Sequence, residues 1–214
     1  MKVGILGSGA VGQALGKGFA DLGHDVKIGT RDPGQEKIKT WVGKTGPKAS
    51  AGTYAEAATF GELLVLSTPW SGTENAIELS EQKNFMGKVV IDVTNPLDFA
   101  SGPPPKLALG HTDSGGEQVQ RWIPDSHVVK AFNIIGAPFM VNPQFAGGPP
   151  DMFICGNDEM AKQKVTDILT AFKWSTIDLG GIEGSRYIEP LAMVWITCEF
   201  RANQWSQAFT LLRR

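Results

Sequence analysis

The chain has 214 residues, enough to bury the core of one α/β domain with an appendage. Its 20 basic and 22 acidic residues give a formal net charge of −2, which excludes a broad basic field for nucleic acid or an anionic membrane. Cys155 and Cys198 are isolated in apolar stretches without metal-ligand spacing, and no run of about 18 apolar residues would span a membrane. Since the first residues already form a strand pattern, leaving no room for a signal peptide, we expect a reduced, cytoplasmic protein without a bound metal.

An apolar strand pattern at residues 2–6 runs directly into G-x-G-x-x-G, followed by a helical pattern that stops near Gly23 and a second strand at residues 24–29. A chain with 26 glycines will produce this spacing by chance, but the strand–turn–helix–strand context favours a dinucleotide-binding turn over a glycine-rich turn without ligand. In such a turn the glycines permit a tight bend, backbone contact with a pyrophosphate, and close helix packing. The predicted pyrophosphate-binding residues are Gly7, Ser8, Gly9, Ala10, Val11 and Gly12.

The end of the second strand predicts which dinucleotide binds. NAD-binding turns place a carboxylate there, roughly 20 residues beyond the glycines, to hold the ribose hydroxyls. Here Thr30 occupies that place, and Arg31 offers a planar guanidinium that suits a 2′-phosphate, so we predict NADP(H). Arg31 as a solvated loop residue is the alternative, and Lys37 is either a further phosphate-binding charge or a surface lysine. Asp32 followed by Pro33 fits the N-cap and first position of the next helix.

Strands and helices alternate along the middle of the chain, as a doubly wound, mostly parallel Rossmann sheet requires. Helices are expected at 38–42, 54–60, 71–82 and 116–122, strands at 48–50, 63–66, 88–93 and 127–132, and a long loop at 98–116. In an open sheet of this kind, ligands bind at the carboxyl ends of the strands. The active site is therefore expected at that edge.

Three strand ends carry small, polar or proline residues, which are typical both of a binding edge and of ordinary strand termination. Their occurrence along one edge favours binding, with asparagine holding the nicotinamide carboxamide and proline supplying rigid apolar surface. The three segments are Thr68-Pro69, Thr94-Asn95-Pro96 and Asn133-Ile134-Ile135-Gly136. From them we predict cofactor contacts by Thr68, Pro69, Asn95, Pro96 and Asn133.

The last third differs in character. A strand is expected at 151–156, an amphipathic helix at 159–172 and another strand at 173–179. From Ser185 the remainder could form one long helix, interrupted near Pro190, with an apolar load larger than one sheet face would cover. We therefore divide the chain into a Rossmann domain at 1–180 and a C-terminal helical segment at 181–214 that packs on the active site or on a second subunit.

Several motifs occur together over nearly the whole chain: Gly7 to Gly12, Gly29-Thr30-Arg31, Thr68-Pro69-Trp70, Asp92 to Pro96, Lys130-Ala131-Phe132-Asn133, and Arg186 with Glu189-Pro190-Leu191. In these motifs the chain resembles the coenzyme F420-dependent NADP oxidoreductases and their bacterial relatives, which include the cytoplasmic reductase domain of membrane metalloreductases. The resemblance implies that the glycine turn holds the pyrophosphate and the Thr30-Arg31 pair the 2′-phosphate. It also implies that a deazaflavin stacks on the nicotinamide at the strand ends, where Ala131 and Asn133 lie, and that members are homodimers whose terminal helices shape the pocket.

We therefore expect an NADP(H)-dependent oxidoreductase that exchanges a hydride with a small-molecule partner, either coenzyme F420, FMN or FAD. Stacked rings need positioning and little proton chemistry, and the sequence identifies no general acid or base. His111 in the expected loop and Tyr187 remain candidates for a proton donor. The alternatives are NADPH-dependent reduction of a small carbonyl or imine, which needs such a donor, and an NADP-binding sensor without turnover.

Overall fold

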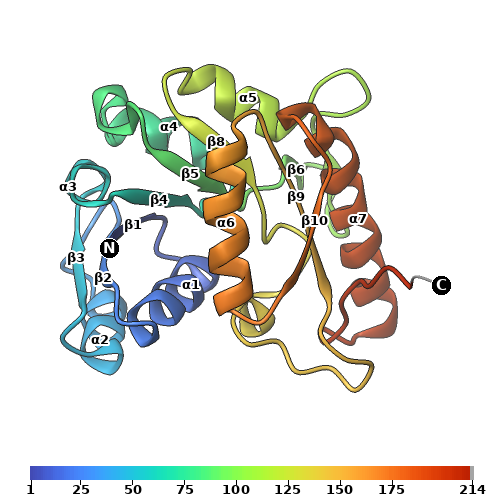
Figure 1. Ribbon diagram of the computed structural model, residues 1–214, viewed down its shortest axis with the longest axis horizontal. Coiled ribbons are helices and arrows are strands. Elements are labelled where there is room, and N and C mark those ends of the chain that lie inside the picture. Colours follow the sequence, from blue (N-terminus) through green and yellow to red (C-terminus); the bar gives the residue numbers. More distant parts are fainter. Residues whose placement is uncertain (213–214) are drawn as a thin grey trace.

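The computed structural model describes residues 1–212, and within them the chain forms an α/β fold around one large sheet (Figure 1). Its eight strands lie in the order β10-β9-β8-β5-β4-β1-β2-β3. All neighbours are parallel except β8 and β9, which confirms the doubly wound, mostly parallel sheet. The strands are β1 (Lys2–Leu6), β2 (Asp25–Gly29), β3 (Ala49–Gly52), β4 (Leu63–Leu66), β5 (Val89–Asp92), β8 (His127–Lys130), β9 (Asp151–Gly156) and β10 (Ser175–Asp178).

The strand register aligns the carboxyl ends of five strands in one row. Leu6 pairs with Gly29 on one side and with Leu66 on the other, and Asp92 pairs with Leu66 and with Lys130. The order of the strands reverses between β1 and β4, which is where an open sheet leaves a crevice for a ligand. The fold therefore brings the glycine turn and the ends of β4, β5 and β8 to the same edge.

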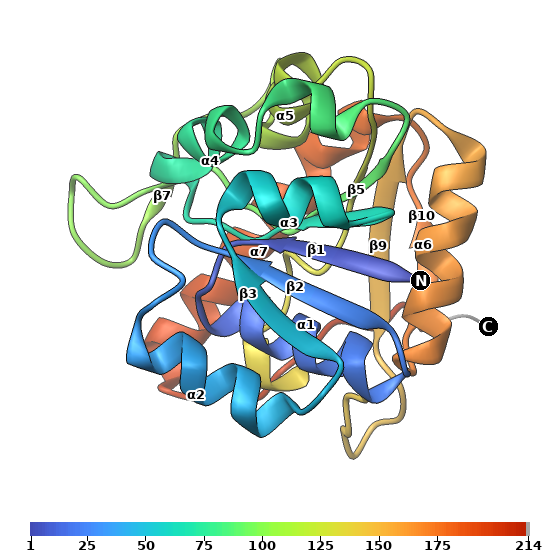
Figure 2. The same ribbon diagram turned by 90° about the vertical axis from the view of Figure 1, so that its left-hand side faces the viewer.

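Helices cover both faces of the sheet. Figure 2 shows α3, α4 and α5 above the strands β1 to β5, and α1 and α2 below them. In Figure 1 α6 crosses in front of the sheet and α7 runs along its right-hand side. The helices are α1 (Ala10–Asp21), α2 (Glu36–Thr45), α3 (Tyr54–Phe60), α4 (Thr73–Leu79), α5 (Gly115–Trp122), α6 (Glu159–Ala171) and α7 (Ser185–Ala202), with short 3-10 turns η1 (Trp70–Gly72), η2 (Gln82–Phe85), η3 (Ala137–Phe139) and η4 (Ile182–Gly184).

The central strands are buried on both faces, as continuous apolar runs predict for a sheet with helices on each side. Every residue of β4 and of β9 is buried. One contiguous apolar core extends from the glycine-turn half of the sheet to the β8–β9 half. The functional segments thus follow directly from buried strands.

Three expected elements differ in the structure. The helix expected after Asp32-Pro33 begins at Glu36, because Asp32 Oδ1 accepts the N–H of Gly34 in a local turn instead of capping a helix. The single helix expected at 71–82 is α4, flanked by η1 and η2. The loop expected at 98–116 contains a short antiparallel pair, β6 (Leu97–Asp98) with β7 (Lys106–Leu107).

The expected C-terminal helix is present, but its extent to the chain end and its interruption near Pro190 were predicted wrongly. α7 passes Pro190 without interruption and ends at Ala202, and the next residue, Asn203, has the left-handed conformation, φ 49°. Residues 203–212 then return to the start of β9 without helical structure, and Asp151 Oδ2 accepts the N–H of Leu211 at 2.7 Å. Part of the apolar load is therefore covered within the chain, as by the edge-on contact of Trp195 with Trp205. The boundary expected near residue 180 falls between β10 and η4, and residues 213–214 of the expected helical segment lie outside the described residues.

Candidate active site

The glycine turn between β1 and α1 has the backbone geometry of a close approach. Gly7 has φ 127°, and a Cβ there would lie 2.6 Å from the Ser67 carbonyl oxygen. A Cβ on Gly12 would collide with the Gly7 carbonyl, whereas a Cβ on Gly9 would meet no atom within 4 Å. Gly7 and Gly12 are thus required by packing, while Gly9 leaves open space in front of the turn.

The amino end of α1 is open to an anion. Its N-cap, Gly9, makes no side-chain hydrogen bond, and the first turn contains no acidic residue. By contrast, side chains cap three other helices: Thr53 caps α3, Ser114 caps α5 and Asp158 caps α6. First-turn N–H groups without a protein acceptor, at the positive end of the helix dipole, fit a pyrophosphate.

Polar groups gather beside this turn at the end of β2. Ser8 Oγ donates to Thr30 Oγ1 at 3.2 Å, and Thr30 is nearly fully buried. Arg31 is exposed, and within residues 1–212 no ion pair engages its guanidinium. Burial raises the pKa of the nearby Tyr54 hydroxyl, and the Arg31 charge opposes that rise. Lys37 is exposed one turn further along, at the start of α2. Two hydroxyls and an unneutralised guanidinium therefore fit a ribose 2′-phosphate.

A cavity of about 340 Å³ opens from the glycine turn along the ends of β4 and β5. Its size falls in the range of small-molecule sites. Of the predicted contacts it includes Gly9, Ala10 and Val11 from the glycine turn and Thr68, Pro69 and Asn95 from the strand ends. Pro96 and Ala131 are buried outside its lining. None of the described residues that line it has an ionisable side chain. They are Gly9, Ala10, Val11, Ser67, Thr68, Pro69, Trp70, Ser71, Val93, Thr94, Asn95, Leu97 and Phe99.

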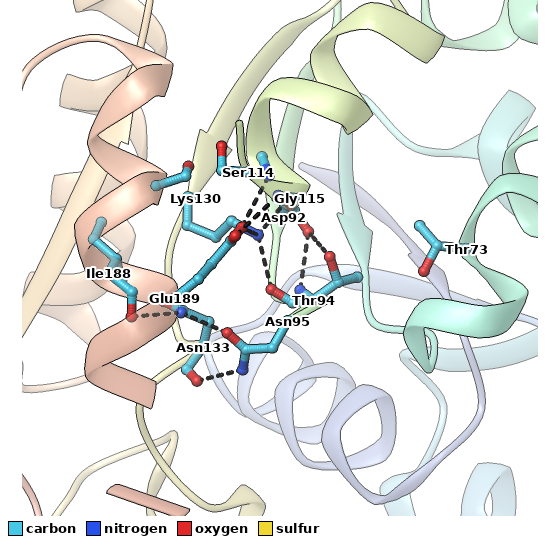
Figure 3. Close-up of polar contacts among 12 residues, drawn as sticks. Thr73, Asp92, Thr94, Asn95, Ser114, Gly115, Lys130, Asn133, Ile188 and Glu189 are labelled. Carbon is cyan, nitrogen blue, oxygen red and sulfur yellow. Dashed lines mark hydrogen bonds and ion pairs between the residues drawn. The ribbon is translucent and has the colours of Figure 1, made fainter. Parts of the chain in front are cut away.

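Asn95 and Asn133 bind each other across the ends of β5 and β8 (Figure 3). Asn95 Nδ2 donates to the Asn133 carbonyl at 2.7 Å, and Asn133 Nδ2 donates to Asn95 Oδ1 at 2.8 Å and to the Ile188 carbonyl of α7 at 3.3 Å. Asn133 is buried behind Asn95 and does not line the cavity. Asn95 is therefore the amide that faces a ligand, and Asn133 holds it in place.

A fully buried lysine lies directly behind this pair. Lys130 Nζ is 2.7 Å from Asp92 Oδ2 and 2.9 Å from Glu189 Oε1, and it donates to the Thr94 carbonyl at 2.7 Å (Figure 3). Burial disfavours its ammonium form, but the charges and hydrogen bonds of Asp92 and Glu189 outweigh that effect, so the pKa of Lys130 is raised. The two carboxylates therefore favour the charged form of the buried lysine.

Glu189 reaches this lysine from α7 and also binds the amino end of α5. Its two carboxylate oxygens accept the N–H groups of Gly115 and Gly116, each at 2.9 Å. The Lys130 cluster, made of Lys130, Asp92 and Glu189, was not among the predicted site residues. Lys130 and Asp92 each end an apolar strand, which is a detectable signal, but nothing local in the sequence places Glu189 beside them.

His111 and Tyr187 lie away from the cavity at the glycine turn. His111 is exposed, with φ 59°, and both residues line a separate cavity of about 680 Å³ between β7 and α7. Arg186 also lines it, with its guanidinium bound to both carboxylate oxygens of Glu117. Neither candidate proton donor is therefore positioned at the strand ends.

In residues 1–212 no three histidine, cysteine or acidic side chains are grouped so as to hold a metal ion. Over the same residues, no helix combines the length and apolar character that crossing a membrane requires.

Comparison with known proteins agrees with this geometry. Residues 2–96 match the family described as NADP oxidoreductase coenzyme F420-dependent. The chain is 32% identical to the F420-dependent NADP reductase of Methanocaldococcus jannaschii over 209 residues, which cover 92% of this chain and 91% of the relative. It is 28% identical to Metalloreductase STEAP3 of Rattus norvegicus, matching 90% of this chain but only 36% of that longer protein.

A solved structure extends the likeness over the full fold. The crystal structure of a candidate F420-dependent NADP-reductase from Arthrobacter sp. FB24 superimposes with a TM-score of 0.94 at 37% identity, covering 100% of both chains. The superposition therefore spans every element from β1 to the C-terminal helix α7. The chain therefore belongs to the coenzyme F420-dependent NADP oxidoreductase family and is an NADP-dependent oxidoreductase.

Proposed function

We propose that the chain transfers a hydride between NADP(H) and the deazaflavin coenzyme F420 at the cavity between the glycine turn and the ends of β4 and β5. The observation that carries this proposal is the cavity lining, in which no described side chain is ionisable. A hydride that passes between two rings needs them held face to face and needs no acid or base in the wall.

The NADP half of the site is built from the groups at the ends of β1 and β2. The open amino end of α1 would bind the pyrophosphate through backbone N–H groups. Thr30, Ser8 and Arg31 would bind the 2′-phosphate, the guanidinium supplying the charge and the two hydroxyls the directed hydrogen bonds. An anionic residue at position 30 would repel that phosphate, and this chain has none there.

The nicotinamide end of the site is the edge formed by Thr68, Pro69, Thr94 and Asn95. When both cofactors are bound, the nicotinamide supplies or takes the hydride, the deazaflavin takes or supplies it, and the accompanying proton exchanges with solvent. Asn95 keeps one amide hydrogen uncommitted, since the other is donated to the Asn133 carbonyl. Apolar groups such as Val93 and Leu97 exclude water from the same wall.

The proposal is limited to F420 because the family description and the M. jannaschii relative both name it, whereas neither names FMN or FAD. Reduction of a carbonyl or imine needs a donor for the developing alkoxide or amine. The polar side-chain groups of the described cavity lining are hydroxyls, an amide and the Trp70 indole, none of which is an acid at neutral pH. The same experiment tests for reduction of a carbonyl or imine and for NADP binding without turnover.

The experiment follows the loss of nicotinamide absorbance when purified protein is mixed with NADPH and F420, with FMN, FAD, a ketone and a cyclic imine in parallel. Among these acceptors we expect turnover of NADPH only with F420. We expect much slower turnover when NADH replaces NADPH. Faster oxidation with the ketone or imine would favour the carbonyl or imine reductase. Tight NADPH binding by calorimetry without any turnover would favour a sensor.

A further inference from the structure

All three polar groups of Thr94, its N–H, its hydroxyl and its carbonyl, form hydrogen bonds with buried charged side chains. Its N–H and its hydroxyl both donate to Asp92 Oδ1, at 2.9 and 2.7 Å, and its carbonyl accepts from Lys130 Nζ at 2.7 Å. Thr94 and Asn95 both line the cavity, whereas Lys130 and Asp92 do not. The backbone at this cavity edge is therefore fixed from behind by an ion pair.

The same ion pair connects the cavity edge to α7. Lys130 Nζ lies 2.9 Å from Glu189 of α7. The carbonyl of Ile188, the preceding residue of α7, accepts a hydrogen bond from the side-chain amide of Asn133, which also donates to Asn95. Two chains of contacts thus run from α7 to two of the residues that line the cavity, one through Lys130 to Thr94 and one through Asn133 to Asn95 (Figure 3).

We propose that Lys130 is a positioning residue: its buried ammonium sets the placement of the Thr94–Asn95 edge and thereby of the nicotinamide ring. This inference rests on the proposed function, in which that edge receives the nicotinamide. Lys130 touches neither ligand, since it is fully buried behind the lining. Its effect on hydride transfer passes through Thr94 and Asn95.

A cation is needed at this position because two carboxylates face it. Replacing Lys130 by methionine keeps the apolar stem but leaves Asp92 and Glu189 close together in a buried site without a counter-charge. Two such carboxylates repel, and one of them moves or takes a proton. Asp92 then no longer holds the N–H and hydroxyl of Thr94 as it does now.

The test compares two ligands by calorimetry. The ligand 2′,5′-ADP carries only the phosphoadenosine part and would contact the glycine turn, Thr30 and Arg31, whereas NADPH also contacts the Thr94–Asn95 edge. For Lys130→Met we expect the affinity for 2′,5′-ADP to stay within about two-fold of wild type and the affinity for NADPH to fall roughly five- to ten-fold. Misplacement of the ring should lower the hydride-transfer rate to F420 further, by roughly 10- to 100-fold.

Lys162→Met is the matched control. Lys162 is also a buried lysine paired with two carboxylates, Asp178 at 2.7 Å and Glu159 at 2.8 Å, but it lies on α6 away from the cavity. Its loss should lower stability while leaving the ratio of the two affinities unchanged. If Lys130→Met does not fold, Asp92→Asn provides a second test, because it keeps the shape of the side chain. We expect it to change the ratio of the two affinities in the same direction.

Equal losses for 2′,5′-ADP and NADPH in the variants, or an unchanged ratio with an unchanged hydride-transfer rate, would overturn the positioning role. Failure of the proposed function has a different signature. In that case the wild-type protein itself would show no F420 reduction, while the ratio of NADPH to 2′,5′-ADP affinity still reports on Lys130.

Discussion

Lys130 and Glu189 form a fully buried ion pair, 2.9 Å between Nζ and Oε1, that joins the end of β8 to the first turns of α7. The carboxylate also accepts two N–H groups at the amino end of α5, so it neutralises a lysine and a helix dipole at once. The C-terminal helix is therefore bound to the edge of the sheet where the cavity opens.

Glu189→Ala should destabilise the fold strongly, because Lys130 would keep a buried charge with one partner fewer and α5 would lose two hydrogen bonds. We expect the free energy of unfolding to fall by about 3–5 kcal/mol, measured by urea denaturation. Glu183→Ala removes an exposed carboxylate from the turn before α7 and serves as the control, with an expected change below about 0.5 kcal/mol. Similar values for the two variants would contradict a structural role for this pair.

Alanine at Gly9 should mainly weaken NADPH binding, whereas alanine at Gly12 should mainly lower the stability of the fold. A methyl group on Gly9 meets no protein atom within 4 Å, so Gly9→Ala should change stability by less than about 1 kcal/mol but weaken NADPH binding by roughly ten-fold or more, since it occupies the space in front of the amides. A methyl group on Gly12 would collide with the Gly7 carbonyl, so Gly12→Ala should lower stability by about 1–3 kcal/mol. Thermal unfolding and calorimetry measure both effects, and a Gly9 variant with normal NADPH affinity would contradict the pyrophosphate site.

Arg31→Ala should discriminate between the two nicotinamide dinucleotides. The lost charge-assisted contact with the 2′-phosphate should weaken NADPH binding by about 1.5–3 kcal/mol and leave NADH binding nearly unchanged. Calorimetry with both cofactors measures the difference. Lys37→Ala, which removes an exposed neighbouring charge, shows whether any positive charge near the site has the same effect. An equal loss for NADPH and NADH in Arg31→Ala would remove the basis of the phosphate assignment.

The glycine turn and the strand ends could be predicted because their signals are local. The positive φ of Gly7 and the close approach of Gly12 to the Gly7 carbonyl are requirements of the turn itself, and the continuous apolar run of β4 indicates burial on both faces. The Lys130 cluster could not be predicted in the same way. It depends on the register of β5 and β8 and on a glutamate nearly 60 residues away in sequence, which only the folded chain brings together.

Local signals also misled at two proline residues. Pro33 after Asp32 is typical of a helix start, but the Asp32 side chain binds Gly34 and the helix begins three residues later. Pro190 is typical of a helix break, yet α7 continues, because the residue lies on the exposed side, where water can bind the carbonyl that loses its partner.

The exposed side of α7 predicts a homodimer. Tyr187, Val194 and Phe200 are 73%, 52% and 43% exposed on one helix, which leaves apolar surface that the folded-back C-terminal segment does not cover. We expect a dimer by sedimentation equilibrium and a shift toward monomer for Val194→Arg. Met160→Arg changes an apolar side chain on α6 that is even more exposed, at 83%, and should leave the dimer intact. A monomeric wild-type protein at micromolar concentration would contradict the prediction.

Glu199 should make the protein less stable as pH rises. The side chain is fully buried, and within residues 1–212 neither carboxylate oxygen has a hydrogen-bond partner. Burial raises its pKa above the ordinary value of 4.5, so the folded state binds more protons than the unfolded chain and stability falls as pH rises from that value. Glu199→Gln keeps the shape without the charge, and we expect it to raise the free energy of unfolding by about 1 kcal/mol at neutral pH and to flatten its dependence on pH in this range.

Urea denaturation at a series of pH values measures both quantities. Glu78→Gln, at an exposed position, should follow the wild-type curve, and a Glu199→Gln curve that also follows it would show that the buried carboxyl is not what titrates.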